Sequence, residues 1–435
     1  MKQKKTFFAY LAFFLSFLFG CVQNEELANP LISNPAALDK ILDDYIDNGA
    51  YPFLYARLED KEGNLIYEHG KVNNDLHPGL TVNGDTWIRI WSMSKIVTIS
   101  VALDLIEEGI LSFEDPVTKF IPELKDRKVA VDYEGTTLAL LDWDKREGAC
   151  PFEVVNNDSV MTVLHLINHE SGFYYATTNM PCLDSLLASI NLPTARNTNE
   201  FIERLARMPL VQHPGTTDFY GINTTVLGMV AERATGKTLN ELVIERLTRP
   251  LKIEGLQYDR PKHATLIPAV SGRDTVLRHA KLGELDIFGP DVPDYEADHQ
   301  LYLGGEGMLA TADGYTDFLR MLLAHGTLND TRFLNTETVE DIYAPHTQLD
   351  NKYGYNGYNL WISGDSMRIK GQGDKGLWIG GGYEGTHFWV DPKREFVGVI
   401  MSQMSFAQPK AYGRDDAFRG EVYRQIFENE AKMAK

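Results

Sequence analysis

The chain has 435 residues, of which 43% are hydrophobic, so it can bury a large core and is long enough for two or three domains. Its formal net charge of −19 at pH 7 repels phosphate backbones, and no cluster of Lys and Arg offsets that repulsion. Composition and charge therefore exclude a nucleic-acid-binding protein and indicate a large, acidic, globular one.

The N-terminus has the features of an export signal. A basic start, MKQKK, precedes the apolar segment FFAYLAFFLSFLFG, which is too short and too early for a membrane-spanning helix. The tetrapeptide LFGC resembles a bacterial lipobox, in which the cysteine, here Cys21, is acylated. We expect residues 1–20 to be removed and residues 21–33 to tether an exported protein to an envelope membrane. The alternative is an ordinary signal peptide with an incidental cysteine.

The mature chain should open with a helix and a β-hairpin. Asn34 can cap a helix whose first position suits Pro35, and apolar residues recur at helical spacing up to Gly49. The strand-like segments PFLYARLE and NLIYEHG follow, joined by the turn residues 60–63. This order is typical of an antiparallel sheet covered by helices.

The segment WSMSK contains the strongest chemical signal. Ser92 and Lys95 form an S-x-x-K pair at the start of an apolar run that ends at Gly109, which predicts a helix with Ser92 in its first turn and Lys95 on the same face. A serine hydroxyl needs a base to become a nucleophile, and an amine one turn away can supply it. The helix N-terminus also favours a developing negative charge. A chance match at a solvated helix start is the alternative.

The flanking segments DTWIRIWSMSK and EEGILSFEDPVTKFIPEL resemble the nucleophile region of the serine β-lactamase-related hydrolases. This superfamily includes penicillin-binding proteins, class C β-lactamases, D-amino-acid peptidases and family VIII carboxylesterases. The resemblance extends over about residues 35–430 and implies an α/β (α+β) fold of the β-lactamase/transpeptidase type, with an antiparallel sheet flanked by helices and a helical subdomain. It implies one catalytic domain over residues 34–432, in which Ser92 is acylated, Lys95 is the base, and no metal or organic cofactor takes part.

Residues 127–160 have mixed charge and no clear period, so we interpret them as an insertion. If Cys21 is lipidated, Cys150 and Cys182 remain as an even pair in an oxidising compartment, which permits a disulfide. Two free thiols remain the alternative.

The segment MTVLHLINHESGFYY resembles the family's helix that runs into a His-x-Ser-Gly turn. His165 and His169 are four residues apart, as a metal pair would be, but no third ligand is spaced with them and HESGF is not H-E-x-x-H. We expect no metal site, and the resemblance gives His169 a structural role.

The segment DFYGINTTVLGMVAERATGK resembles the second catalytic motif of the family, a tyrosine on a loop before a helix. Its spacing matches the esterase-like form Y-G-x-x-x-x-V-L-G and identifies Tyr220 as the proton-relaying residue. The β-lactamase form Y-x-N would place asparagine at Ile222, whereas Asn223 is one residue late. Helical spacing begins at Val226 and ends at Gly236. An ordinary loop aromatic is the alternative for Tyr220.

Two glycine-rich segments follow. Residues 304–307 (GGEG) are interpreted as a turn near the site, and LWIGGGYEGTHFWVDPKREFVGVIMSQ as two strands joined at Asp391-Pro392, before a last helix over 417–431. The first of these strands fits Trp-x-Gly by residue type, but counting back from Gly385-Thr386 leaves its register open. The oxyanion hole should combine the N–H of Ser92 with an N–H from Gly380, Gly381 or Gly382.

These signals predict a serine hydrolase that acts on ester or amide substrates, either small molecules or cell-wall fragments. Esters are favoured over β-lactams, because the third motif lacks the lysine that holds the substrate carboxylate in β-lactamases. The alternatives are a β-lactamase, a D-amino-acid peptidase or penicillin-binding protein, and a non-catalytic cell-wall-binding lipoprotein of the same fold. A Ser-His-Asp α/β-hydrolase is disfavoured because the sequence contains no G-x-S-x-G.

Overall fold

The computed structural model describes residues 31–435 except 274–275, 282–283, 285–298 and 349–351. The predicted signal peptide, Cys21 and most of the tether lie outside the described residues. The folded domain begins slightly earlier than expected: Ile32 is buried, and the backbone N–H of Ser33 donates to Gln425 Oε1 at 3.0 Å. In the described part of the chain no helix is long and apolar enough to cross a membrane.

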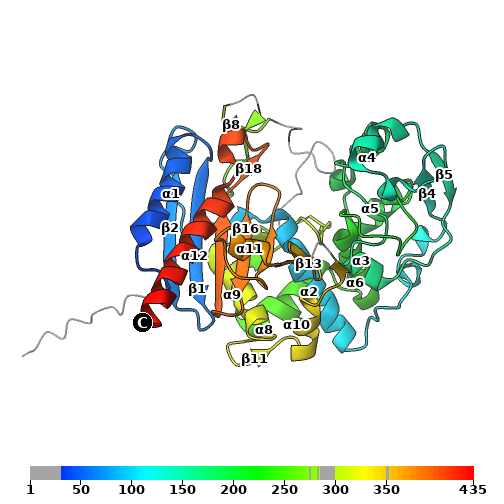
Figure 1. The fold of residues 1–435 in the computed structure, drawn as a ribbon. Coiled ribbons are helices and arrows are strands. Elements are labelled where there is room, and N and C mark those ends of the chain that lie inside the picture. Colours follow the sequence, from blue (N-terminus) through cyan, green and yellow to red (C-terminus); the bar gives the residue numbers. More distant parts are fainter. Residues whose placement is uncertain (1–30, 274–275, 282–283, 285–298, 349–351) are drawn as a thin grey trace, which may run out of the picture.

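An eight-stranded antiparallel sheet forms the centre of the molecule (Figure 1). Its order is β12-β13-β14-β15-β16-β17-β1-β2, so the first two strands of the chain complete a sheet built from its C-terminal part. β1 joins the two portions by pairing with β17, where Tyr55 lies opposite Met401. The bounds are β1 (Phe53–Asp60), β2 (Leu65–Val72), β12 (Thr347–Gln348), β13 (Gly354–Asn356), β14 (Trp361–Ser363), β15 (Trp378–Gly381), β16 (His387–Asp391) and β17 (Phe396–Met401).

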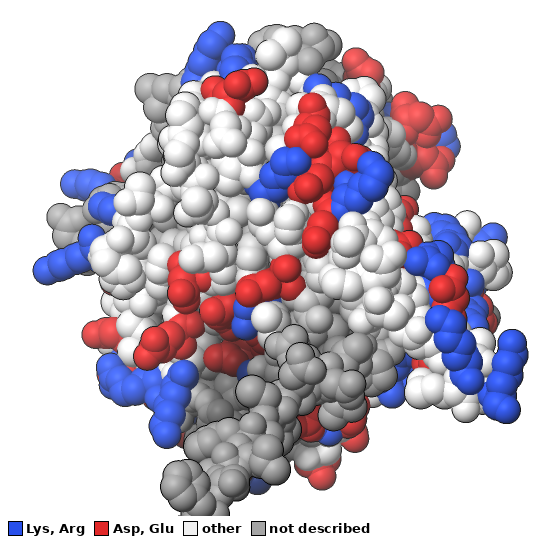
Figure 2. Space-filling model, turned by 90° about the vertical axis from the view of Figure 1, so that its left-hand side faces the viewer, with Lys and Arg blue, Asp and Glu red and all other residues white. Residues whose placement is uncertain are grey.

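Helices cover both faces of this sheet. α1 (Pro35–Asp47) and α12 (Arg414–Met433) pack on one face and bury one apolar stripe each, while α9 (Ala312–Leu323) packs on the other against β17 and β1. α1 begins at Pro35 as predicted, although the Asn34 side chain makes no capping hydrogen bond. The outer side of this layer faces the viewer in Figure 2, where acidic and basic side chains are interspersed.

The rest of the chain forms a helical subdomain beside the sheet (Figure 1). α2 (Ser94–Glu107) lies between the two parts and packs against α6 (Asn223–Thr235). Every residue of α2 from Ser94 to Leu103 is buried, which explains why its sequence is apolar all round. The other helices of the subdomain are α3 (Val163–Ile167), α4 (Pro181–Ile190) and α5 (Thr198–Leu205).

The segment 127–160 is more regular than its sequence suggested. It contains a two-stranded antiparallel sheet, β4 (Lys128–Val131) with β5 (Glu153–Asn156), and short 3₁₀ turns between them. The residues before Cys150 show no periodic pattern, so the sequence did not indicate this strand pair. β5 is exposed at the surface. A disulfide joins Cys150 to Cys182 of α4, with the two Cα atoms 5.8 Å apart.

We expect the Cys150–Cys182 bond to contribute to stability. The cysteines are 32 residues apart, and closing a loop of that length in the unfolded chain corresponds to about 3–4 kcal/mol. Cys182→Ser should lower the free energy of unfolding by that amount in urea titrations of the oxidised protein. Mass spectrometry after alkylation without reductant provides the check, since two alkylated thiols in the wild-type protein would contradict the bond.

The remaining elements are short and connect these layers. Two three-stranded sheets and one two-stranded hairpin comprise β3 (Ile88–Arg89), β6 (Leu256–Gln257) and β9 (Leu309–Ala310); β7 (Val270–Ser271), β8 (Arg278–His279) and β18 (Met404–Ser405); and β10 (Thr327–Leu328) with β11 (Thr331–Arg332). The short helices are α7 (Leu239–Leu242), α8 (Arg249–Leu251), α10 (Thr336–Ile342) and α11 (Ser366–Ile369).

Candidate active site

Ser92 lies at the junction of the sheet and the helical subdomain. It belongs to a 3₁₀ turn, Trp91–Met93, that leads directly into α2, so the regular helix starts two residues after the serine instead of including it. Lys95 is in the first turn of α2 and is fully buried, whereas Ser92 is partly exposed. The distance from Lys95 Nζ to Ser92 Oγ is 3.1 Å. The S-x-x-K spacing thus brings the hydroxyl and the amine into contact.

Tyr220 reaches the same oxygen from the other part of the molecule. Its hydroxyl donates to Ser92 Oγ at 2.7 Å. The residue lies on the loop before α6, and that helix begins at Asn223, three residues earlier than predicted. Tyr220 is 53% exposed, so its hydroxyl can meet a substrate as well as Ser92.

His169 supports the ring of Tyr220. The two rings stack with their centroids 4.9 Å apart. His169 Nδ1 accepts from Asn223 Nδ2 at 3.0 Å, and Nε2 lies 3.3 Å from Asn359 Oδ1. Burial, together with the nearby charge of Lys95, lowers the pKa of His169 to about 3, so the ring is neutral and both nitrogens are engaged.

The other histidine of the candidate metal pair has a separate role. His165 forms a capping box with Thr162 at the start of α3. Within the residues that the structure describes, no group of three or more His, Cys, Asp or Glu side chains is arranged to hold a metal ion.

A buried carboxylate, which the sequence did not predict, lies behind the lysine. Glu306 Oε1 is 3.4 Å from Lys95 Nζ, and both side chains are fully buried. Lys95 also donates to Tyr175 OH at 2.8 Å and to the carbonyl of Gly305 at 2.9 Å. Glu306 accepts from Tyr175 OH and from Thr225 Oγ1. A buried ion pair is tolerated only when its remaining polar atoms are satisfied, and this network satisfies them.

The sequence did contain a signal for this network. The turn 304–307 was interpreted only as backbone geometry, yet it places a carboxylate between glycines in an otherwise apolar stretch. A Cβ at Gly305 would lie 3.0 Å from Thr225 Oγ1 and 3.3 Å from Lys95 Nζ, so a side chain there would crowd this network. Burial and Glu306 raise the pKa of Tyr175 well above its usual value, so this tyrosine stays protonated and donates to the carboxylate.

The register of β15 distinguishes the three predicted oxyanion glycines by the direction of their N–H groups. The N–H of Gly382 is already engaged within the protein, because it donates to Thr386 O at 2.9 Å. In an antiparallel ladder, hydrogen-bonded pairs alternate, so the next pair is Gly380 with Phe388. The N–H of Gly381 therefore points away from β16, towards the side on which β14 lies. β14 does not pair with Gly381, because the last residue of β15 that pairs with β14 is Ile379. This N–H lies on the β14 side of β15, a strand that also contacts the serine turn.

The residues described above lie in a segment that matches a known protein family. The chain matches the Beta-lactamase family over residues 39–419. The chain belongs to the β-lactamase family. This matched segment contains Ser92, Lys95, Tyr220 and the β15 strand, and it confirms the predicted family and fold.

Relatives of this β-lactamase-family chain include proteins named for ester and acyl-transfer chemistry. Lovastatin esterase of Penicillium rubens is 25% identical, covering 87% of this chain and 96% of its own length. The ML-236A carboxylate methylbutanoyltransferase mlcH of Penicillium citrinum is 26% identical over 60% of this chain and 56% of its own. The solved structure of EstCE1, described as a hydrolase with promiscuous acyltransferase activity, has a TM-score of 0.71 at 18% identity, covering 91% of this chain and 99% of its own.

The nucleophile turn of this β-lactamase-family protein is held by the hairpin that follows β15. Trp91 has a left-handed backbone (φ 46°), which is costly for a bulky residue. Its indole N–H donates to the buried carboxylate of Glu384 at 2.8 Å, and Gln403 Nε2 donates to the same oxygen at 3.0 Å. A Cβ on Gly382 would lie 2.4 Å from Ile90 O. The serine turn and the β15 hairpin are therefore packed directly together.

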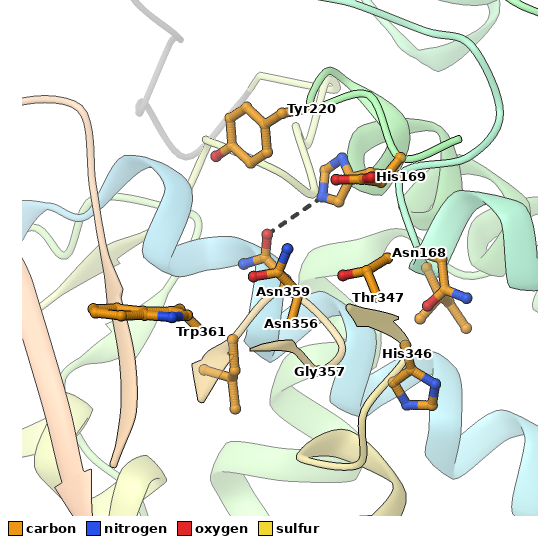
Figure 3. Close-up of a pocket in the computed structure, with 12 residues that line it drawn as sticks. Asn168, His169, Tyr220, His346, Thr347, Asn356, Gly357, Asn359 and Trp361 are labelled. Atoms are coloured by element: carbon orange, nitrogen blue, oxygen red, sulfur yellow. Dashed lines mark hydrogen bonds between the residues drawn. The ribbon is translucent and has the colours of Figure 1, made fainter. Parts of the chain in front are cut away.

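A cleft of about 240 Å³ opens beside Tyr220 (Figure 3). One wall comes from the end of α3 and the loop that carries Tyr220, and the other from β12, β13 and β14. Its polar and aromatic lining includes Asn168, Asp218, His346, Thr347, Asn356 and Trp361. No lysine or arginine is among the described residues that line it.

Proposed function

We propose that this protein is a serine hydrolase that cleaves carboxylic esters through an acyl-enzyme on Ser92. The observation that carries the proposal is the contact of one partly exposed oxygen, Ser92 Oγ, with both Lys95 Nζ at 3.1 Å and Tyr220 OH at 2.7 Å. A hydroxyl placed between a base and a proton donor is the arrangement that covalent acyl transfer requires.

Each group has one task in the proposed reaction. Ser92 Oγ attacks the carbonyl carbon while Lys95, reacting in its neutral amine form, takes the hydroxyl proton. The carboxylate of Glu306 stabilises the ammonium that forms. The N–H groups of Ser92 and Gly381 bind the oxyanion. Tyr220 gives its proton to the departing alkoxide and recovers one from Lys95. In the second half Tyr220 passes its proton to Lys95 as it takes one from water, whose oxygen attacks the acyl carbon. Lys95 then returns a proton to Ser92 Oγ as the acid is released.

Ester substrates are favoured over β-lactams and peptides for two reasons. The residue nearest to the asparagine of Y-x-N is Asn223, and it is fully buried with its amide engaged by His169 and Ser171. The cleft beside Tyr220 also offers no cation to a substrate carboxylate among its described residues. The names of the esterase and transferase relatives support the same class. The substrate would be a small molecule or a cell-wall-derived acyl compound.

We expect p-nitrophenyl butyrate to be hydrolysed with a much larger kcat/KM than nitrocefin. The carboxylate of a β-lactam finds no cation here and so lacks a charge-assisted contact worth about 1.5–3 kcal/mol. This loss corresponds to a kcat/KM that is roughly tenfold to hundredfold lower. Both substrates are assayed on one preparation, with the Ser92→Ala protein as the background. If nitrocefin is turned over as well as the ester, the protein is a β-lactamase. If neither turns over and no serine-directed probe labels it, the non-catalytic alternative holds.

We further propose that Cys21 is diacylated and anchors the protein to an envelope membrane of a bacterium. The basic and apolar leader that ends in Gly-Cys supports this, and two acyl chains give lasting attachment where one is marginal. Cys21→Ser should move the protein from the membrane fraction to the soluble fraction. An unchanged membrane fraction and an unchanged mass for this variant would contradict the anchor.

A further inference from the structure

We propose that the cleft beside Tyr220 binds the alcohol half of the ester, and that this alcohol is neutral and carries several hydroxyl groups, as a sugar does. The inference rests on the proposed ester hydrolysis and names the class of its leaving group. It is carried by the position, the unpartnered polar atoms and the charge of the cleft (Figure 3).

The position of the cleft assigns it to the leaving group. Tyr220 is among its lining residues, whereas Ser92, Lys95 and Gly381 are not. Tyr220 OH is the atom proposed to return a proton to the departing oxygen. A group that fills the cleft is therefore attached to that oxygen, and the acyl part lies on the other side of Ser92, towards β15.

Two polar atoms in the cleft lack hydrogen-bond partners and would favour a ligand that carries hydroxyl groups. Asn168 Oδ1 and Thr347 Oγ1 both line the cleft, are buried, and have no hydrogen-bond partner in the protein. Leaving such an atom unsatisfied costs about 1–3 kcal/mol, so a ligand that satisfies both gains that amount. They come from separate elements, the end of α3 and β12, and Figure 3 shows Thr347 between Asn168 and the amide of Asn356 on β13. A single ring bearing several hydroxyls can donate and accept at all three positions.

The remaining walls suit a neutral ring. Trp361 offers an aromatic surface at one side of the cleft (Figure 3), and sugars present apolar C–H faces as well as hydroxyls. Asp218 places a carboxylate at the exposed end, which repels carboxylates and phosphates and accepts from hydroxyls. His346 Nε2 is engaged by Asp341 O at 2.7 Å, and the ring of His346 stacks on Tyr358 with the centroids 3.9 Å apart.

The test compares three acetate esters of primary alcohols. 6-O-acetylglucose and cyclohexylmethyl acetate share the acyl group and the ring size but differ in hydroxyl groups, and acetylcholine offers a cation. The full-length protein in detergent is assayed for acetate release. We expect kcat/KM to be at least about tenfold larger for 6-O-acetylglucose than for either other ester, since two or more hydrogen bonds to buried atoms separate them.

Two isosteric variants locate the effect. Thr347→Val and Asn168→Leu each remove one unpartnered atom and should each lower the ratio of glucose to cyclohexylmethyl ester about threefold or more. Thr331→Val removes a hydroxyl from β11, which does not line the cleft, and should leave the ratio unchanged.

A ratio of one or less in the wild-type protein, or a ratio that both cleft variants leave unchanged, overturns the proposal. Acetylcholine as the best of the three substrates also overturns it, because Asp218 would then select a cation. Hydrolysis of p-nitrophenyl acetate by the wild-type protein reports the ester hydrolase function separately, so its loss would refute the proposed function and not merely this preference.

Discussion

Ser92→Ala should abolish ester hydrolysis and covalent labelling by a fluorophosphonate probe, while the protein stays folded. The serine oxygen is the only protein atom in the proposed reaction that forms a bond to the acyl group, and no neighbour can replace it, because Lys95 Nζ is fully buried behind it. A loss of this kind is on the order of a thousandfold or more in kcat, down to the background set by binding and the oxyanion groups. The measurements are probe labelling and p-nitrophenyl butyrate turnover.

Tyr220→Phe is the matched variant for this result. It removes only the hydroxyl 2.7 Å from Ser92 Oγ and keeps the ring that stacks on His169. Turnover should fall about a hundredfold, the usual effect of losing a positioned acid or base, whereas the serine remains available to the probe. Full activity in the Ser92→Ala protein would refute the acyl-enzyme assignment, and an unlabelled wild-type protein would favour the binding-protein alternative.

Lys95→Met should inactivate the protein and also destabilise it. The variant removes the base and leaves the fully buried Glu306 without its ion-pair partner at 3.4 Å. Breaking a buried pair from one side costs about 3–5 kcal/mol, because the remaining charge has no compensation. Urea unfolding followed by circular dichroism measures that loss, and ester turnover should fall about a hundredfold or more at the same time.

The double variant Lys95→Met/Glu306→Gln separates the two effects. Removing both charges restores a neutral buried site, so most of the lost stability should return, while activity should not, since no base faces Ser92. Ser92→Ala, which leaves the ion pair intact, is the control and should unfold close to the wild-type midpoint. If the double variant recovers activity with its stability, Lys95 has only a structural role. If it remains as unstable as Lys95→Met, the two residues are not energetically coupled.

Local sequence patterns were sufficient to predict several features of the site and the fold. The S-x-x-K spacing at the start of an apolar run was sufficient to place Ser92 and Lys95 in contact, because residues three apart on a helix share a face. The tyrosine motif identified the loop before α6, and the Beta-lactamase match over residues 39–419 confirms the family that these motifs suggested. The start of α1 at Pro35 followed from its helix-start signals.

Boundaries and short elements were less certain. The regular part of α2 begins at Ser94, and α6 begins at Asn223, whereas the predicted starts were Ser92 and Val226. Polar residues at a helix end do not contribute to the apolar period, so the period does not locate the first residue. The β4–β5 sheet in residues 127–160 was missed, because its strands have only four residues each and neither alternates: β4 is buried after its first residue and β5 is exposed throughout.

Only the tertiary structure decided which distant residues complete the site. Glu306 lies 211 residues from Lys95 in the sequence, and its charge is acceptable only because Lys95, Tyr175 and Thr225 surround it in space. The choice of Gly381 over its neighbours followed from the alternation of hydrogen bonds with β16, which depends on strand register and not on residue type. The cleft beside Tyr220 likewise exists because α3 and the β12–β14 strands meet there. The sequence motifs identified the candidate catalytic groups, and packing determined their partners, because the energy of a buried charge or an unpaired N–H depends on the groups that surround it.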